Sequence, residues 1–412
     1  MSDPARFEPL KVAVIGGGAA GFFAAFSVKE HHPEAEVSLF EKTGKLLAKV
    51  KVSGGGRCNV THACFTPSLL SKSYPRGEKQ MKKAFAVFQP EDTVKWFLKR
   101  RVELKAEDDG RMFPVSNDSQ TIIDCFLEEA RAQHIRIATQ TAVEEITPTD
   151  QGFSLGFRGT ETPVHFDKVI IATGGSPKES GLNWLKNLGH PIASPLPSLF
   201  TFNIPKHPIV KLMGLVVEQA TVRIQGTKLA YSGPVLVTHW GMSGPAVLKL
   251  SAWGARKLAE QNYRFTVQVN WLSIKNEAEV NLMLDEALPG MRRKKITNAN
   301  PFQLPSRMWA YLIGKAEISP DAVWLDLPKK KRNKLINLLL NDTYDVSGKT
   351  TFKEEFVTCG GVKWEGIKVD SMESRSCPGL YFAGEVIDVD GITGGFNFQA
   401  AWTTGYIAGK LS

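Results

Sequence analysis

A glycine-rich turn near the N-terminus constrains the fold of this chain more than any other feature. Residues 11–15 (KVAVI) predict a short buried strand, and residues 16–21 (GGGAAG) follow it as a turn. Residues 22–30 predict a helix that stops before Pro33, because proline cannot continue a helix. Residues 36–40 (EVSLF) predict a second strand. This strand–helix–strand unit is typical of an α/β fold.

The turn has the spacing Gly16-x-Gly18-x-x-Gly21. The first glycine permits the tight turn, the second lets a pyrophosphate approach the backbone, and the third lets the helix pack closely on the sheet. The helix N-terminus supplies N–H donors and a partial positive charge. Glu41 ends the second strand, where a carboxylate can hold the ribose hydroxyls of an adenosine. The unit predicts a dinucleotide site; the alternative is a glycine turn without a ligand.

Two later turns indicate which dinucleotide binds. Thr173 and Gly174 end a predicted strand at residues 164–171, and Gly384 and Glu385 follow another at residues 380–383. In flavoproteins such turns return to the same cofactor, whereas a simple NAD dehydrogenase needs no return near the C-terminus. The sequence therefore predicts FAD. A second G-x-G-x-x-G is absent, so NAD(P)H is expected as a transient reductant, unless another reductant serves.

The length of 412 residues predicts two domains or one domain with a large insertion. A proline-rich stretch at residues 191–208 marks a boundary, after which alternating strands and then helices follow. Between Pro195 and Asp345 there are 20 Lys and Arg but 11 Asp and Glu, so this third carries the whole net charge of +9. We expect an FAD-binding domain at residues 1–194 and 346–412, interrupted by a substrate or partner subdomain at 195–345.

The five cysteines are scattered and never form a C-x-x-C pair. This pattern fits a reducing cytoplasm and argues against a zinc site or a disulfide framework. No apolar run approaches the ~20 residues that span a bilayer, and residues 1–9 do not read as a secretory signal. We therefore expect a cytoplasmic protein with no membrane contact and no bound metal.

Several long strings resemble one known family. They are Gly16–Gly21, SGGGRCN at residues 53–59, GRMFP at 110–114, THWGMSGP at 238–245, and the GE…DVDG…GGFN series at 384–397. These strings are similar to the bacterial BaiN/YhiN-like flavoproteins, also known as the aminoacetone-oxidase family of FAD-binding proteins. The resemblance extends from Lys11 to Gly409.

The resemblance implies a glutathione-reductase-type, Rossmann-like FAD domain with an inserted, barrel-like subdomain of strands and helices. It also implies a reductase that moves a hydride between nicotinamide, flavin and an activated C=C bond. Members are linked to enone reduction and to the reduction of uracil in ribosomal RNA to dihydrouridine. The residues expected at the cofactor are Gly16, Gly18, Ala19, Ala20, Gly21, Glu41, Lys42, Ser53, Gly55, Gly56, Arg57, Asn59, Val143, Thr173, Gly174, Gly384, Glu385, Gly394, Gly395 and Asn397.

Reduction of a conjugated C=C bond needs a hydride at one carbon and a proton at the next. Cys58 is a candidate proton donor, because a thiol can give that proton, and Arg57 is a candidate to orient the ring or pair with phosphate. A buried structural cysteine is the alternative for Cys58. His62 and His239 are further candidate donors, with structural histidines as the alternative.

The insert predicts a second partner. Its basic runs are Arg292, Arg293, Lys294 and Lys295, and Lys329, Lys330, Lys331 and Arg332. Tryptophans are interspersed, and aromatic residues among basic ones suit unstacked bases, so structured RNA is a possible ligand; solubilising charge is the alternative. The leading hypothesis is reduction of uracil in ribosomal RNA. A small-molecule enone reductase or amine oxidase, or a non-catalytic flavin-containing RNA- or ribosome-binding factor, are the others.

Overall fold

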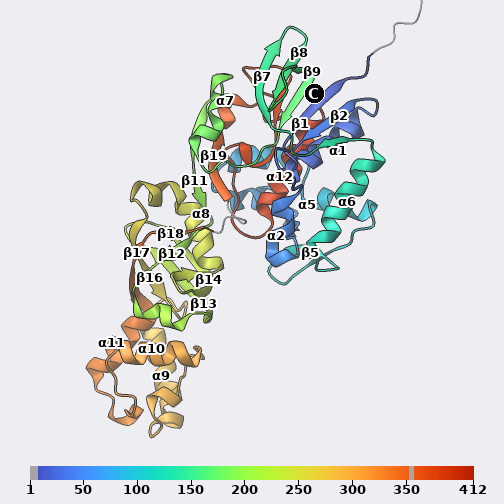
Figure 1. The fold of residues 1–412 in the computed structure, drawn as a ribbon. Helices are drawn as coiled ribbons and strands as arrows, with labels where there is room; N and C mark the ends of the chain where they lie inside the picture. The colour runs from blue at the N-terminus through green and yellow to red at the C-terminus, as the bar shows by residue number, and fades with distance from the viewer. Residues whose placement is uncertain (1–7, 352–356) are drawn as a thin grey trace, which may run out of the picture. The chain divides into compact units, whose positions relative to one another are not determined.

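The computed structural model describes residues 8–351 and 357–412 (Figure 1). The chain forms two compact units, one of Met1–Ser198 with Lys353–Ser412 and the other of Leu199–Phe352. Both boundaries lie later than the sequence analysis places them. The second boundary differs because strand β17 (Asp342–Ser347) and strand β18 (Lys349–Thr350) pair with strands of the second unit.

A five-stranded parallel sheet is the centre of the first unit. Its order is β20 (Leu380–Phe382), β10 (Lys168–Ile171), β1 (Lys11–Ile15), β2 (Glu36–Phe40) and β6 (Arg136–Ala138). The three central and first-edge strands β1, β10 and β20 are short runs that are almost fully buried, as is usual for parallel sheets covered by helices, whereas the edge strand β6 has no buried residue. Their carboxyl ends lie at one edge, so the turns after β1, β2, β10 and β20 come together there.

Helices α1 (Ala19–His31) and α12 (Phe396–Gly409) come from opposite ends of the chain and pack against each other (Figure 1). Close approach is possible because Gly405 and Gly409 face α1. A Cβ atom at Gly409 would lie 2.4 Å from the carbonyl oxygen of Ala24. The pairing brings the last strand and the last helix to the first glycine turn.

Smaller elements complete the first unit. The helices are α2 (Ala48–Gly56), α3 (Pro67–Leu70), α4 (Glu78–Ala84), α5 (Pro90–Lys99), α6 (Ser119–Ala132) and α7 (Asn183–Asn187). The strands form the sheets β3–β5–β4 (Thr61–His62, Arg111–Pro114, Leu104–Ala106), β7–β8–β9 (Val143–Thr149, Gly152–Phe157, Val164–Phe166) and β11–β19 (Ile192–Ser198, Val357–Val362). Helix α2 lies in a stretch rich in lysine and glycine, and it breaks at Ser53 and the glycines that follow.

The second unit contains a closed antiparallel sheet. Its order is β17, β16 (Arg264–Asn270), β13 (Val216–Ile224), β14 (Ala230–Val237), β15 (Gly241–Ser243), β12 (Thr201–Asn203) and β18. Strands β17 and β18 are consecutive in the chain. Between them, the N–H of Gly348 bonds to Tyr263 and its carbonyl accepts from Asn203. One stretch of chain thus joins both edges of the sheet, which confirms the barrel-like insert.

Four helices accompany the barrel. They are α8 (Pro245–Glu260), α9 (Glu277–Met291), α10 (Ser306–Lys315) and α11 (Lys329–Asn341). The insert has its own apolar core, in which Trp271, Trp309 and Tyr344 are buried. Asp342 at the start of β17 accepts hydrogen bonds from Trp271 Nε1 (3.1 Å) and Lys315 Nζ (2.5 Å) and from the Tyr344 hydroxyl. These bonds satisfy a carboxylate that is otherwise buried.

Candidate functional site

The first glycine turn has two closed positions and one open position. A Cβ atom at Gly16 would lie 2.3 Å from the Ala172 carbonyl oxygen, and one at Gly21 would lie 1.9 Å from the Gly16 carbonyl oxygen. Both positions therefore require glycine for packing. A Cβ atom at Gly18 would meet nothing within 4 Å. Gly18 is thus the position at which a ligand can approach the backbone.

Gly18 is also the N-cap of α1, and no side chain caps this helix. The first-turn N–H groups of a helix have no partner within the helix, and the helix dipole makes this end partly positive. Ala19 is partly exposed here, whereas Ala20 is buried beneath Gly384. The end of α1 therefore presents backbone donors to an anion such as a pyrophosphate.

Glu41 lies beside this turn. Its carboxylate accepts hydrogen bonds from the N–H of Gly17 (2.9 Å) and from the N–H and hydroxyl of Thr43 (both 2.8 Å). Lys42 is exposed, and Val143 is half-buried on the segment whose Thr141 N–H bonds to the Glu41 carbonyl. A carboxylate accepts about four hydrogen bonds, so Glu41 keeps capacity for a ribose hydroxyl.

The two later turns lie next to the first. Gly174 has φ +75° with open space at its Cβ position, and Thr173 is exposed. A Cβ atom at Gly175 would lie 2.6 Å from the Glu385 carboxylate. Glu385 accepts from the Thr358 N–H (2.7 Å) and forms an ion pair with Lys49 Nζ (2.6 Å). Lys49, which its charge alone would place on a solvated face, therefore contacts this turn.

The glycine string of the family resemblance forms a break in α2. Ser53 has extended backbone, and Gly54, Gly55 and Gly56 all have positive φ. A Cβ atom at Gly55 or Gly56 would meet nothing within 4 Å. The break therefore leaves an open stretch of backbone, as the first turn does at Gly18.

The N-terminus of α12 is held from the same segment. Oriented to satisfy both of its polar atoms, the buried Asn59 amide accepts from the Gly395 N–H (3.0 Å) and donates to the Thr61 carbonyl (3.0 Å). A Cβ atom at Gly395 would lie 2.4 Å from the Thr61 carbonyl oxygen. The Asn397 amide bonds both polar groups of the Gly391 backbone, closing the loop before α12.

The structure argues against Cys58 as a proton donor. Its side chain is 0% exposed, so no substrate can reach the sulfur. Burial also raises the pKa of its thiol to about 12, with the Ser53 hydrogen bond acting in the opposite direction. Cys58 is therefore a buried structural thiol, the alternative weighed in the sequence analysis.

Arg57 is occupied by protein groups. Its guanidinium forms an ion pair with Glu107 (2.6 Å) and lies 4.0 Å from the centroid of the Phe113 ring. These contacts hold it against the neighbouring sheet.

The two histidines differ in their surroundings. His62 Nδ1 lies 3.1 Å from the Gly394 carbonyl oxygen, and its ring packs on Phe396, so it adjoins the start of α12. His239 is exposed in the second unit, beside the Trp240 ring. Of the candidate donors, His62 is the one that the first unit brings to the turns described above.

We refer to the open glycine positions of the first unit, together with Glu41 and the start of α1, as the cofactor cradle. Gly18, Gly55, Gly56 and Gly174 each have free space where a side chain would lie, and α1 has no side-chain cap. Open glycines beside an uncapped helix and a carboxylate with spare hydrogen-bonding capacity suit a dinucleotide. The residues present therefore fit FAD.

The basic runs of the insert divide into paired and unpaired side chains. Among the residues that the structure describes, ion pairs engage Lys295 with Asp321, Lys331 with Glu317 and Arg332 with Asp285. The exposed side chains with no ion pair in the described ranges are Arg292, Arg293, Lys294, Lys329 and Lys330. This distinction cannot be read from a charge count.

Neither a membrane span nor a metal cluster is found across residues 8–351 and 357–412. No helix there is long and apolar enough to cross a bilayer. No group of three or more His, Cys, Asp and Glu side chains there could hold a metal ion.

Comparison with known families gives a match over nearly the whole chain. The model of the HI0933-like protein Rossmann domain matches residues 10–411. A 3-dehydro-bile acid delta(4,6)-reductase of Clostridium scindens is 28% identical, covering 98% of each chain. A ribosomal RNA dihydrouridine synthase of Escherichia coli is also 28% identical, covering 97% of this chain and 96% of that protein.

Solved structures give the same fold at low identity. A 3-ketosteroid-delta4-(5alpha)-dehydrogenase from Rhodococcus jostii aligns over 98% of both chains with a TM-score of 0.51 and 14% identity. A 3-ketosteroid delta1-dehydrogenase from Sterolibacterium denitrificans aligns over 97% of this chain and 98% of that one, with a TM-score of 0.50 and 12% identity.

Proposed function

The chain belongs to the family of HI0933-like proteins with a Rossmann domain, and from this premise we propose that it reduces an activated C=C bond with NAD(P)H as the electron donor. It is an FAD-dependent oxidoreductase. When bound, FAD supplies the hydride chemistry, because its ring can accept two electrons from one substrate and pass them to another.

The chain's own residues position the cofactor. The backbone at Gly18 and the start of α1 would hold the pyrophosphate, and Glu41 would hold the adenosine ribose. Gly394 and Gly395 directly precede α12, whose N-terminal N–H groups would stabilise negative charge on a reduced ring. His62 is the candidate that would hold a proton at this end.

The best single substrate is uracil in ribosomal RNA, which would become dihydrouridine. The similarity to the Escherichia coli ribosomal RNA dihydrouridine synthase supports this choice. The observation that carries it is the net charge of +9 confined to the insert together with the exposed, unpaired cations there. Such side chains would contact phosphates, and affinity would then fall with salt.

A small-molecule enone reductase is the second candidate. The similarity to the bile acid delta(4,6)-reductase favours it, because that relative also covers nearly the whole chain. Its substrate would need no phosphate-binding surface. Turnover of an enone with no effect on RNA would identify this function.

Mass spectrometry of nucleosides from ribosomal RNA of a deletion strain tests the proposal. Loss of dihydrouridine, restored by the wild-type gene but not by a Glu41→Ala gene, is the expected result. Unchanged dihydrouridine would exclude the RNA substrate. If NADPH failed to bleach the bound flavin under anaerobic conditions, the reductase itself would be excluded.

A further inference from the structure

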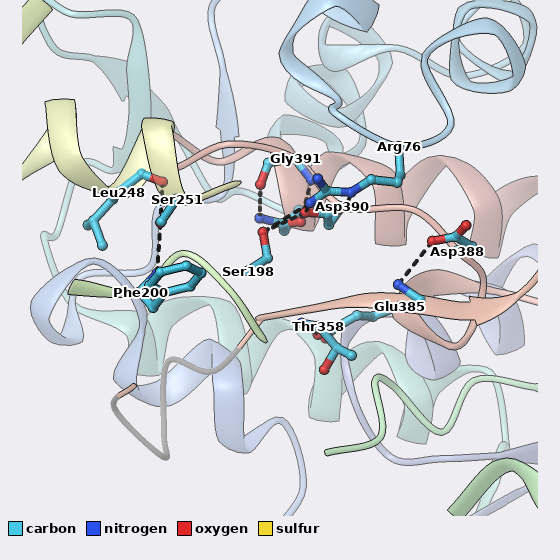
Figure 2. Close-up of polar contacts among 12 residues, drawn as sticks. Arg76, Ser198, Phe200, Leu248, Ser251, Thr358, Glu385, Asp388, Asp390 and Gly391 are labelled. Atoms are coloured by element: carbon cyan, nitrogen blue, oxygen red, sulfur yellow. Dashed lines mark hydrogen bonds and ion pairs between the residues drawn. The ribbon is translucent and has the colours of Figure 1, made fainter. Parts of the chain in front are cut away.

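The turn that carries Glu385 holds three carboxylates, and each of them contacts the β11–β19 ribbon (Figure 2). Glu385 accepts from the Thr358 N–H (2.7 Å), and Asp388 accepts from the Gly360 N–H (2.9 Å). Asp390 accepts from the Ser198 hydroxyl (2.6 Å). The same turn leads into α12, so one short segment contacts the ribbon and continues into the helix that would face the flavin.

The ribbon also connects the two units. Strand β11 ends at Ser198, and the second unit begins at Leu199. Strand β19 begins at Val357, soon after the second unit ends. Because both passages of the chain adjoin this ribbon, its attachment to the turn fixes where the chain leaves the first unit.

Asp390 is the most constrained member of the set. It is 0% exposed, and the Arg76 guanidinium binds both of its carboxylate oxygens. Arg76 also donates to the Ser198 hydroxyl at 3.2 Å. The three side chains form a closed set in which each contacts the other two, and such buried charged networks hold one geometry.

Leu199, the first residue after Ser198, lies between two buried residues that are each held by a hydrogen bond. The N–H of Phe200 bonds to the Ser251 hydroxyl (2.8 Å), which in turn donates to the Leu248 carbonyl (Figure 2). Both Phe200 and Ser251 are 0% exposed. Between Ser198 and Phe200, Leu199 has φ +48°, a conformation that non-glycine residues rarely adopt unless their surroundings impose it.

We propose that Ser198 is a positioning residue, which acts through Asp390 to hold the exit of the chain toward the inserted unit in register with the turn before α12. Its hydroxyl does not contact the cofactor cradle directly. Its effect would be on the turnover of the acceptor, and not on cofactor binding. The acceptor part of this inference rests on the proposed function.

The Ser198→Ala variant tests the proposal, because it removes the bond to Asp390 and leaves the Arg76 pair in place. Ser194→Ala is the matched control. Ser194 lies on the same strand but donates to Glu179 (2.9 Å), away from the turn. Ser198→Thr keeps a hydroxyl and should restore wild-type behaviour.

Three kinds of measurement compare these variants as FAD-loaded full chains. Hydrogen exchange of peptides covering residues 192–200 should be faster in Ser198→Ala than in Ser194→Ala. Reduction of the flavin by NADPH and its reoxidation by oxygen should stay within about twofold of wild type. Turnover of the acceptor, either ribosomal RNA or a 3-keto-4,6-diene bile acid, should fall about five- to tenfold in kcat.

Equal hydrogen exchange of residues 192–200 in Ser198→Ala and Ser194→Ala would overturn the proposal. So would a ratio of acceptor turnover to oxygen turnover that is the same in Ser198→Ala as in Ser194→Ala. If the wild type reduced neither acceptor, the proposed function would fail. The exchange comparison would still decide whether Ser198 holds the exit of the chain.

Discussion

Some charged residues at the turns make only contacts within the protein, whereas others are placed to contact a ligand. Glu41 is proposed for the second role, because its carboxylate adjoins the Gly17 N–H and keeps capacity for further donors. Asp390 illustrates the first, because every contact that it makes is internal to the protein. The two carboxylates should therefore respond differently to neutralisation.

Replacing Glu41 with Gln should weaken FAD binding. Hydrogen bonds to a charged group contribute about 1.5–3 kcal/mol, so the Kd for FAD should rise about tenfold or more in a flavin fluorescence titration. Glu36→Gln is the control, since Glu36 is exposed at the start of the same strand. An equal Kd for the two variants would show that Glu41 does not hold the ribose.

The buried Asp390 should give the protein a pH-dependent stability. Burial raises the pKa of its carboxyl from 3.8 to about 6, against the lowering effect of Arg76 and Ser198. Between these two values the folded state binds a proton that the unfolded state does not. The Asp390 carboxyl therefore contributes its full stabilisation of the folded state below pH 3.8, and this contribution is lost as the pH rises through about 6.

Asp390→Asn isolates this contribution. The difference in unfolding free energy between the wild type and this variant, measured by urea denaturation, should grow in favour of the wild type as the pH falls from 7 to 4. A constant difference over that interval would contradict the raised pKa.

At the level of elements, the strand–turn–helix at the N-terminus separates two roles of glycine. Gly21 has no room for a side chain, whereas Gly18 faces open space. Gly18→Ala should leave the folding stability of the FAD-free protein within about 1 kcal/mol of wild type and should lower FAD affinity. Gly21→Ala should lower both. Thermal unfolding with and without FAD checks the pair, and equal affinity of Gly18→Ala and wild type would contradict it.

The elements also show what the sequence can predict. The βαβ unit, the closing helix and an insert of strands and helices follow from local patterns of apolar residues and glycines, whereas the barrel-like form of the insert was implied by the family resemblance. Helix α2 does not follow from such a pattern, because its three consecutive glycines predict a loop and the helix breaks at Ser53. The pairs Lys49–Glu385 and Arg76–Asp390 join residues 336 and 314 positions apart, so no local pattern indicates them.

Side-chain roles were less predictable than the fold. Cys58 stands in a specific motif, which favoured a chemical role, yet its sulfur is inaccessible. The basic runs read as uniform charge, yet Lys295, Lys331 and Arg332 are engaged by acidic side chains. Burial and pairing depend on distant segments, and a linear sequence does not report them.

For the whole molecule, two units with separate cores should unfold separately. The insert has a continuous apolar core of its own, and the described residues of the first unit contain the cofactor cradle. Calorimetry should therefore show two transitions. Excess FAD at about 100 times its Kd should raise the transition of the first unit by roughly 5–10 °C and leave the other unchanged. One transition that shifts as a whole would contradict this independence.

The closure of the inserted sheet at Gly348 removes part of a sheet edge that would otherwise accept another strand. Gly348 bonds to Tyr263 on one side and to Asn203 on the other, and β18 pairs with β12, so the backbone groups at this point are already hydrogen-bonded. An extended peptide cannot add itself as a strand there, and a macromolecule that docks at this point must be recognised by side chains. The same closure protects this part of the sheet against strand-to-strand aggregation when the protein is concentrated.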